Sequence, residues 1–152
     1  MIYITVEQTK TLIEGLLSEP FFDGLEMVRL ELMTAVTRTV DGKIHGEFYD
    51  SQEEVRGEYI RWREEKPNFF QAIRGKVLPL SFKIVFRYPK EESEKLIGRA
   101  AELCSLYLNI SYDRKNTGIT TGVAQNIFPP DQTVGQEWDR FVQEVMHRLD
   151  IG

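Results

Sequence analysis

Several residue types and patterns are scarce in this chain, and each scarcity excludes a class of protein. The 152 residues include one cysteine, Cys104, which excludes a framework of intramolecular disulfides. Neither of the two histidines has a histidine or cysteine partner at metal-ligand spacing, so the common zinc motifs are excluded. No apolar run approaches the roughly 20 residues that cross a bilayer. The first residues also lack the basic start and apolar stretch of a signal peptide. We therefore expect a protein of the reducing cytoplasm, with no membrane partner.

An excess of positive charge is also missing. The chain has 19 Lys and Arg residues against 24 Asp and Glu residues, for a net charge of −5, whereas dedicated DNA binders usually carry a basic face. The motifs of nucleophilic and phosphate chemistry are missing too, since there is no Gly-x-Ser-x-Gly elbow and no Gly-x-x-x-x-Gly-Lys loop. The sequence therefore indicates no catalytic residue, no metal ligand and no cofactor.

The length and the apolar content predict one domain with its own core. A chain of 152 residues, 41% of them hydrophobic, buries about 70% of its unfolded surface on folding, which is sufficient without a disulfide or a metal. Hydrophobic periodicity predicts both strands and helices, so the expected fold class is α+β in a single domain over residues 1–152. The expected strands are 2–6, 25–40, 43–49, 80–88, 105–112 and 119–128, with 25–40 either one long strand or a bent pair of strands. The expected helices are 6–17, 51–65, 68–74, 91–103 and 133–149.

Two turn and breaker signals set the expected connections. Asp41-Gly42 favours a two-residue hairpin of type I′ between the strands at 25–40 and 43–49. Pro67 is expected to end one helix and to open the next, because proline suits a first helical turn. The final helix has the clearest amphipathic pattern, with Trp138 at the centre of its apolar stripe.

The order of these elements suggests an internal repeat. Residues 2–49 and 80–128 both run strand, helix and hairpin, with a helical insert at 51–75 and an amphipathic helix at the end. A true duplication and a chance recurrence are both open. The order resembles the repeating unit of sliding DNA clamps, which implies a clamp-like fold. It departs from the clamps by having helices at 52–74 and 133–149 in place of a further strand, so encircling DNA is not expected.

A second resemblance covers nearly the whole chain. It is carried by the opening strand and helix, by Phe48-Tyr49-Asp50, by the Leu-Ser-Phe-Lys-Ile-Val-Phe strand at 80–86 and by the terminal helix with Trp138. In these features the chain resembles a family of small uncharacterised bacterial proteins, a domain of unknown function. The resemblance implies a bacterial cytosolic origin, and it implies no activity and no functional residue.

Charge is unevenly distributed along the chain. Residues 61–87 carry seven basic side chains against two acidic ones, and aromatic residues alternate with them. Arginine together with aromatic side chains is typical of nucleic-acid surfaces and of protein hot spots. The alternative is that the aromatic residues belong to the core and the basic residues form its solvated rim. The candidate binding residues are Arg61, Trp62, Arg63, Lys66, Arg74 and Lys76.

Three functional classes follow from these observations. We expect first a non-enzymatic interaction or scaffold protein, which forms a homodimer or binds another protein. The second class is a nucleic-acid-associated accessory protein that uses segment 61–76. The third is an enzyme whose site matches no known motif.

Overall fold

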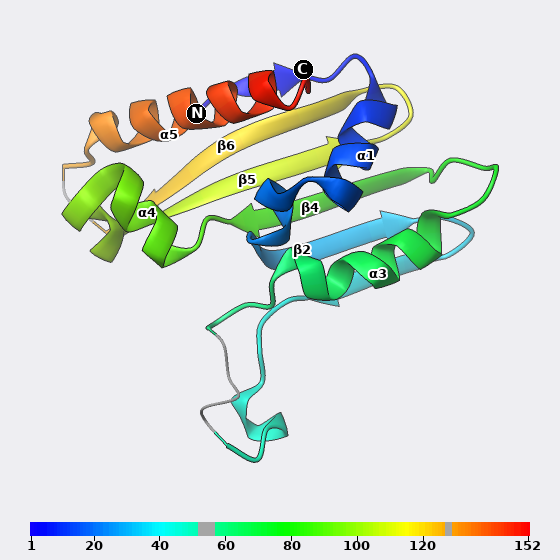
Figure 1. The fold of residues 1–152 in the computed structure, drawn as a ribbon, viewed down its shortest axis with the longest axis horizontal. Coiled ribbons are helices and arrows are strands. Elements are labelled where there is room, and N and C mark those ends of the chain that lie inside the picture. The colour runs from blue at the N-terminus through cyan, green and yellow to red at the C-terminus, as the bar shows by residue number, and fades with distance from the viewer. Residues whose placement is uncertain (52–56, 127–128) are drawn as a thin grey trace.

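The protein is built on one antiparallel sheet, with α1, α3 and α5 packed over the same face (Figure 1). The computed structural model describes residues 1–51, 57–126 and 129–152. Six strands pair in the order β1-β6-β5-β4-β2-β3, which confirms the α+β class. The strands are β1 (Tyr3–Thr5), β2 (Glu26–Met33), β3 (Thr37–Asp41), β4 (Ser81–Arg87), β5 (Cys104–Tyr112) and β6 (Thr117–Gln125). The helices are α1 (Thr9–Ser18), α2 (Pro20–Asp23), α3 (Trp62–Ile73), α4 (Lys90–Ile97) and α5 (Gln132–Arg148), with 3-10 turns η1 (Gly46–Phe48) and η3 (Gly98–Glu102).

Strand alternation separates a buried face of the sheet from a polar one. Along β5 every second residue is buried, because successive side chains point to opposite faces. The inward-facing residues meet in register across the sheet, in a row made of Ile4, Ile119, Ile110, Ile84 and Leu30. On the other face the same strands carry polar and charged residues such as Lys83 and Arg29, both exposed. The helices therefore cover only the apolar side of the sheet.

The elements with the cleanest patterns form as the sequence predicts. Strand β4 buries its alternate apolar residues, as the pattern at 80–88 predicts. Helix α5 buries Trp138 completely, and Asp131 caps the helix by accepting a hydrogen bond from the Thr133 amide. The helix expected at 91–103 divides at Gly98, whose φ of 63° ends α4 and starts η3.

The hairpin predicted at Asp41-Gly42 is wrong. Strands β2 and β3 already form a hairpin, and its turn lies at residues 34–36. Gly42 lies beyond the end of β3, where its amide donates to the Val28 carbonyl at 2.9 Å. A Cβ atom at Gly42 would lie 1.7 Å from the backbone oxygen of Met27. The glycine is therefore required by the close approach of two chain segments and not by a turn.

The helix predicted at 51–65 is also corrected. Residues 52–56 of that prediction lie outside the described residues, and residues 57–61 form a bend followed by β-bridges from Tyr59 to Lys43 and from Arg61 to Glu26. The strand predicted at 43–49 contains the 3-10 turn η1 instead. Helix α3 begins at Trp62 and continues through Pro67, so this proline does not separate two helices. Pro67 lies on an exposed face of the helix and removes only one backbone hydrogen bond there, so the helix tolerates it.

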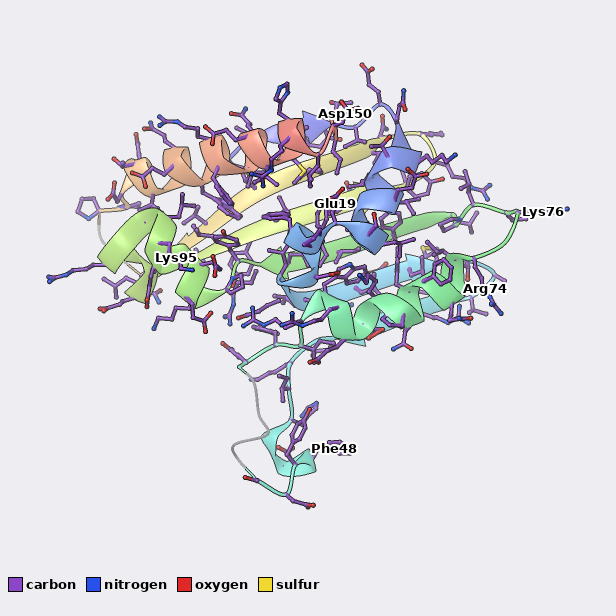
Figure 2. The ribbon with its side chains drawn as sticks, viewed as in Figure 1. Glu19, Phe48, Arg74, Lys76, Lys95 and Asp150 are labelled. Carbon is purple, nitrogen blue, oxygen red and sulfur yellow. The ribbon has the colours of Figure 1, made fainter. Side chains whose placement is uncertain are left out.

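Residues 43–51 and 57–60 form a projection, which we call the arm. The arm leaves the body between β3 and α3 and points away from the sheet (Figure 1). Its two sides are joined near the body by a hydrogen bond from the Ile44 amide to the Glu58 carbonyl at 2.9 Å. Phe48 lies far from the body (Figure 2), and 84% of its surface is exposed.

The clamp-like duplication is not confirmed. In a duplicated fold the first strand of each repeat would occupy an equivalent place in the sheet. Strand β1 is instead an edge strand that pairs with β6, whereas β4 is central and pairs with both β2 and β5. The recurring element order of 2–49 and 80–128 therefore does not correspond to a recurring arrangement in the sheet.

Candidate interaction surface

The candidate basic residues lie at two separate places on the molecule. Arg61, Arg63 and Lys66 lie at or near the first turn of α3, and Arg74 and Lys76 follow its last residue. A helix of 12 residues is about 18 Å long, and Figure 2 shows Arg74 and Lys76 at the far end, beside the loop to β4. The segment 61–76 therefore contributes to two surfaces and not to one continuous patch.

Trp62 is a core residue, which corrects its place among the candidate binding residues. None of its surface is exposed, and its indole nitrogen donates to the carbonyl of Leu16 at 2.7 Å. In a continuing helix that carbonyl would accept from the amide of residue 20, but Pro20 has no N–H. Trp62 therefore completes the end of α1. Phe69 is buried as well, whereas Phe70 is 46% exposed.

Two of the candidate cations already hold neighbouring segments together. The Nζ atom of Lys66 lies 2.6 Å from Oδ1 of Asp23, at the end of α2. Arg61 donates through Nη1 to the carbonyl of Gly24 at 2.8 Å, and its side chain is 20% exposed. These contacts dock the start of α3 on α2, so both residues have structural roles.

A groove runs beside these residues, and we call it the α2–α4 groove. It has a volume of about 470 Å³ and is lined by residues of α2, of the segment that links the arm to α3, and of the start of α4. Arg61 and Arg63 lie along it, together with Glu91 and Glu92 of α4, and Arg61 lies 4.0 Å from Glu91. Its aromatic lining is formed by Phe21 and Tyr88, whose ring centroids are 6.5 Å apart. The groove therefore combines apolar rings with charges of both signs.

Exposed apolar side chains gather at the other end of α3, in a set that we call the apolar end. Val77 is 77% exposed and Leu78 is 59% exposed. The loop that carries them is held by Arg114, which donates to the carbonyls of Leu78 at 2.7 Å and of Pro79 at 3.2 Å. The apolar end consists of Phe70 in the last turn of α3 and of Val77, Leu78 and Leu80 in the loop that follows it. Arg74 and Lys76 lie among these residues in the chain, so the apolar end is also basic.

The base of the arm is fixed by an ion-pair cluster around Arg87. Its guanidinium lies 2.6 Å from the Glu26 carboxylate and 3.0 Å from that of Glu58, and it stacks over the Tyr59 ring at 4.7 Å. Burial alone would lower the pKa of Arg87, but the two carboxylates outweigh burial and raise it. Burial raises the pKa of Glu26, and the attraction of Arg87 opposes that rise without cancelling it. The cluster is therefore a structural one that joins the arm to the sheet.

A small polar cleft of about 260 Å³ adjoins this cluster, and it contains the single cysteine. Burial raises the pKa of the Cys104 thiol, and the nearby Asp131 adds to the rise. A thiol with a raised pKa is a poor nucleophile, because the thiolate is the reactive form. Within residues 1–51, 57–126 and 129–152, no three histidine, cysteine or carboxylate side chains are grouped to hold a metal ion. No helix in the same ranges has the length and apolar character that a bilayer crossing requires.

Two features of these surfaces were missed by the sequence reasoning. The apolar alternation places Phe48 in the strand expected at 43–49, although Gly46 two residues earlier is an available signal for a turn. Val77 and Leu78 stand between Gly75 and Pro79, where two backbone breakers indicate a loop. Apolar residues in such a loop are candidates for exposure.

Comparison with known proteins identifies the family. No curated protein and no solved structure matches the chain. A family model described as "Family of unknown function (DUF5721)" matches residues 15–152. The match includes β2 to β6 and α2 to α5, and therefore both surfaces described above. Because it extends over well more than half of the 152 residues, the chain belongs to the DUF5721 family.

Proposed function

We propose that this chain is a non-enzymatic interaction protein and that it binds another protein through the apolar end. The observation that carries the proposal is the exposure of Val77, at 77%, and of Leu78, at 59%, in a loop that Arg114 holds in place. Contiguous exposed apolar side chains with a polar rim are typical of protein-binding surfaces. A loop that is already ordered loses less entropy on binding.

The charge around the apolar end favours an acidic partner. The chain has a net charge of −5, yet Arg74 and Lys76 adjoin Val77 and Leu78 in the sequence. A local positive field steers a negatively charged partner into the correct orientation. The partner class is therefore a protein segment with alternating acidic and apolar side chains. We place the interaction in a bacterial cytoplasm, which suits a chain whose single cysteine, Cys104, is unpaired.

Selection from a displayed peptide library tests this proposal. We expect enrichment of peptides that combine acidic and apolar residues, and we expect Leu78→Asp to abolish their binding without loss of stability. Leu103→Asp is the matched control, because Leu103 is an apolar residue of similar exposure, 50%, in another part of the fold. Peptides that bind the Leu78→Asp variant as tightly as the parent protein would contradict the proposal.

A nucleic-acid-associated role is the second candidate, and the exposure of Arg63, Arg74 and Lys76 favours it. Its test is binding of single- and double-stranded oligonucleotides at low salt. Binding through phosphate contacts would weaken steeply with salt, and replacing Arg74 or Lys76 would reduce that slope. Absence of any binding at low salt would remove this candidate and leave the first one in place.

A further inference from the structure

The far part of the arm presents Phe48 to solvent. Phe48, labelled in Figure 2, is 84% exposed, and Tyr49 packs edge-on against it with ring centroids 5.5 Å apart. A large apolar side chain on a projection is a poor arrangement for an isolated molecule, because water must surround it. It is a common arrangement for an anchor residue that enters a pocket on a partner.

The α2–α4 groove has the size and the lining that such an anchor needs. Its volume of about 470 Å³ exceeds that of one phenylalanine side chain. Phe21 and Tyr88 provide aromatic surfaces, and aromatic rings attract one another in edge-to-face and offset arrangements. Phe48 can therefore pack in the groove against rings of its own kind.

The acidic side chains of the arm complement one unpaired cation of the groove. Glu47 and Asp50 lie on either side of Phe48 in the chain, and both are exposed. Two arginines and two glutamates lie along the groove: Arg61 lies 4.0 Å from Glu91, Glu92 lies 3.3 Å from Lys95, and no ion pair joins Arg63 to another of the described residues. An arm that inserts Phe48 would bring its two carboxylates to the guanidinium group of Arg63, which would gain its first ion pair.

The position of the groove indicates that the partner is a second copy of the chain. Arg61, which lines the groove, directly follows residue 60 of the arm and forms a β-bridge with Glu26. The groove therefore lies at the base of the arm, while Phe48 lies far from that base (Figure 2). A twofold axis beside the arm would bring the Phe48 of each copy to the groove of the other. The surface is thus self-complementary in the way that a twofold dimer requires.

We propose that the protein forms a reciprocal dimer in which Phe48 of each arm occupies the α2–α4 groove of the other copy. This surface is distinct from the apolar end, so the dimer stands independently of the proposed function. The arm is suited to the task because Arg87 fixes its base through Glu58 and Tyr59. The direction of the arm is therefore set before the two copies meet, which lowers the entropic cost of association.

Sedimentation equilibrium of the full chain over a range of concentrations tests the dimer. We expect the parent protein to dimerise, and we expect Phe48→Ser and Arg63→Glu each to raise the dimer dissociation constant by at least about tenfold. Both side chains are exposed in a single copy, so neither change should lower the stability of the fold. Leu103→Ser and Leu78→Asp are controls at exposed apolar positions outside the arm and the groove, and they should leave the dissociation constant unchanged.

Mixing the two variants distinguishes a reciprocal exchange from any other dimer. The Phe48→Ser copy retains an intact groove, and the Arg63→Glu copy retains an intact arm. A mixed dimer therefore has one complete contact, whereas each variant alone has none. We expect the mixture to associate more tightly than either variant by itself. A parent protein that stays monomeric, a dimer that tolerates both substitutions, or a mixture that associates no better than its components would each overturn the proposal.

Discussion

The Nη2 atom of Arg87 lies 2.6 Å from Oε2 of Glu26, and this ion pair joins the last residue of β4 to the first residue of β2. The Glu26 side chain is 6% exposed, so its charge depends on Arg87 for compensation. The pair also lies directly under the arm, because Arg87 reaches Glu58 as well. The ion pair therefore connects the stability of the sheet to the placement of the arm.

Arg87→Met is expected to destabilise the fold by about 3 to 5 kcal/mol at pH 7, because it leaves a buried carboxylate without its ion-pair partner. The loss of Arg87 raises the pKa of Glu26 further, so the cost becomes smaller as the pH falls and Glu26 takes up a proton. Urea unfolding at several pH values measures both effects. The double variant Glu26→Gln with Arg87→Met should regain much of the lost stability. If Arg87→Met loses as much stability relative to the parent protein at low pH as it does at pH 7, the role of Arg87 as the partner of a charged Glu26 is contradicted.

Glu65→Gln is expected to stabilise the protein at pH 7 by about 1 kcal/mol or less. Burial raises the pKa of Glu65, which is 9% exposed, and a hydrogen bond with Asn68 opposes the rise only in part. The folded state thus holds its proton to a higher pH than the unfolded state does. The free energy of unfolding therefore falls as the pH rises from the unfolded-state pKa of Glu65 through its folded-state pKa. The full contribution of Glu65 is present only below the unfolded-state pKa. Glu64→Gln, at an exposed neighbour, is the control. Equal effects of Glu65→Gln at pH 7 and at about pH 4 would argue against the buried carboxylate.

Gly42→Ala is expected to cost about 3 kcal/mol or more, because its Cβ would lie 1.7 Å from the Met27 carbonyl oxygen. Gly46→Ala is the matched control, since nothing lies within 4 Å of a Cβ at that position. Its effect should stay within about 0.5 kcal/mol. Chemical denaturation measures the free energy of unfolding of both variants. Similar losses of stability in the two would show that the backbone freedom of glycine, and not the close approach to Met27, is what Gly42 provides.

Arg114→Gly is expected to loosen the loop at 74–80 with little effect on global stability. The substitution removes the two hydrogen bonds to Leu78 and Pro79, but glycine adopts the φ of 72° of residue 114 without strain. Hydrogen exchange should accelerate in the loop and remain unchanged in β5. Peptides that bind the apolar end should bind more weakly, because the loop must then be ordered on binding. Lys115→Ala, at the next position of the same turn, should change neither the hydrogen exchange of the loop nor the binding of these peptides.

The sequence predicts best those strands and helices whose formation is determined by the pattern of their own residues. The alternation of Phe82, Ile84 and Phe86 and the stripe of α5 are local patterns, and both elements form as expected. Gly42 was misjudged because a glycine beside an aspartate indicates a turn, whereas its actual requirement comes from a segment 15 residues earlier in the chain, at Met27. Single-sequence patterns do not contain such contacts between distant segments.

The candidate site was limited in the same way. Arginine and aromatic residues in one segment predict a binding surface, but composition does not show which side chains face the core. The donor that Leu16 needs, in place of the missing amide of Pro20, decides that Trp62 points inward. Arg74 and Lys76 remain exposed, and they stay candidates as predicted. The exposure of Phe48 depends on an arm whose existence no periodicity indicates.

The hydrogen bond from Trp62 to Leu16 also bears on how the protein unfolds. It spans 46 positions of the chain and supplies the last turn of α1 with a donor that the local sequence does not provide. Helix α1 is therefore incomplete until α3 docks, and α3 in turn loses a buried partner if α1 frays. The two helices should open together as a single cooperative unit, with the same free energy of opening for the amides at both ends of that bond.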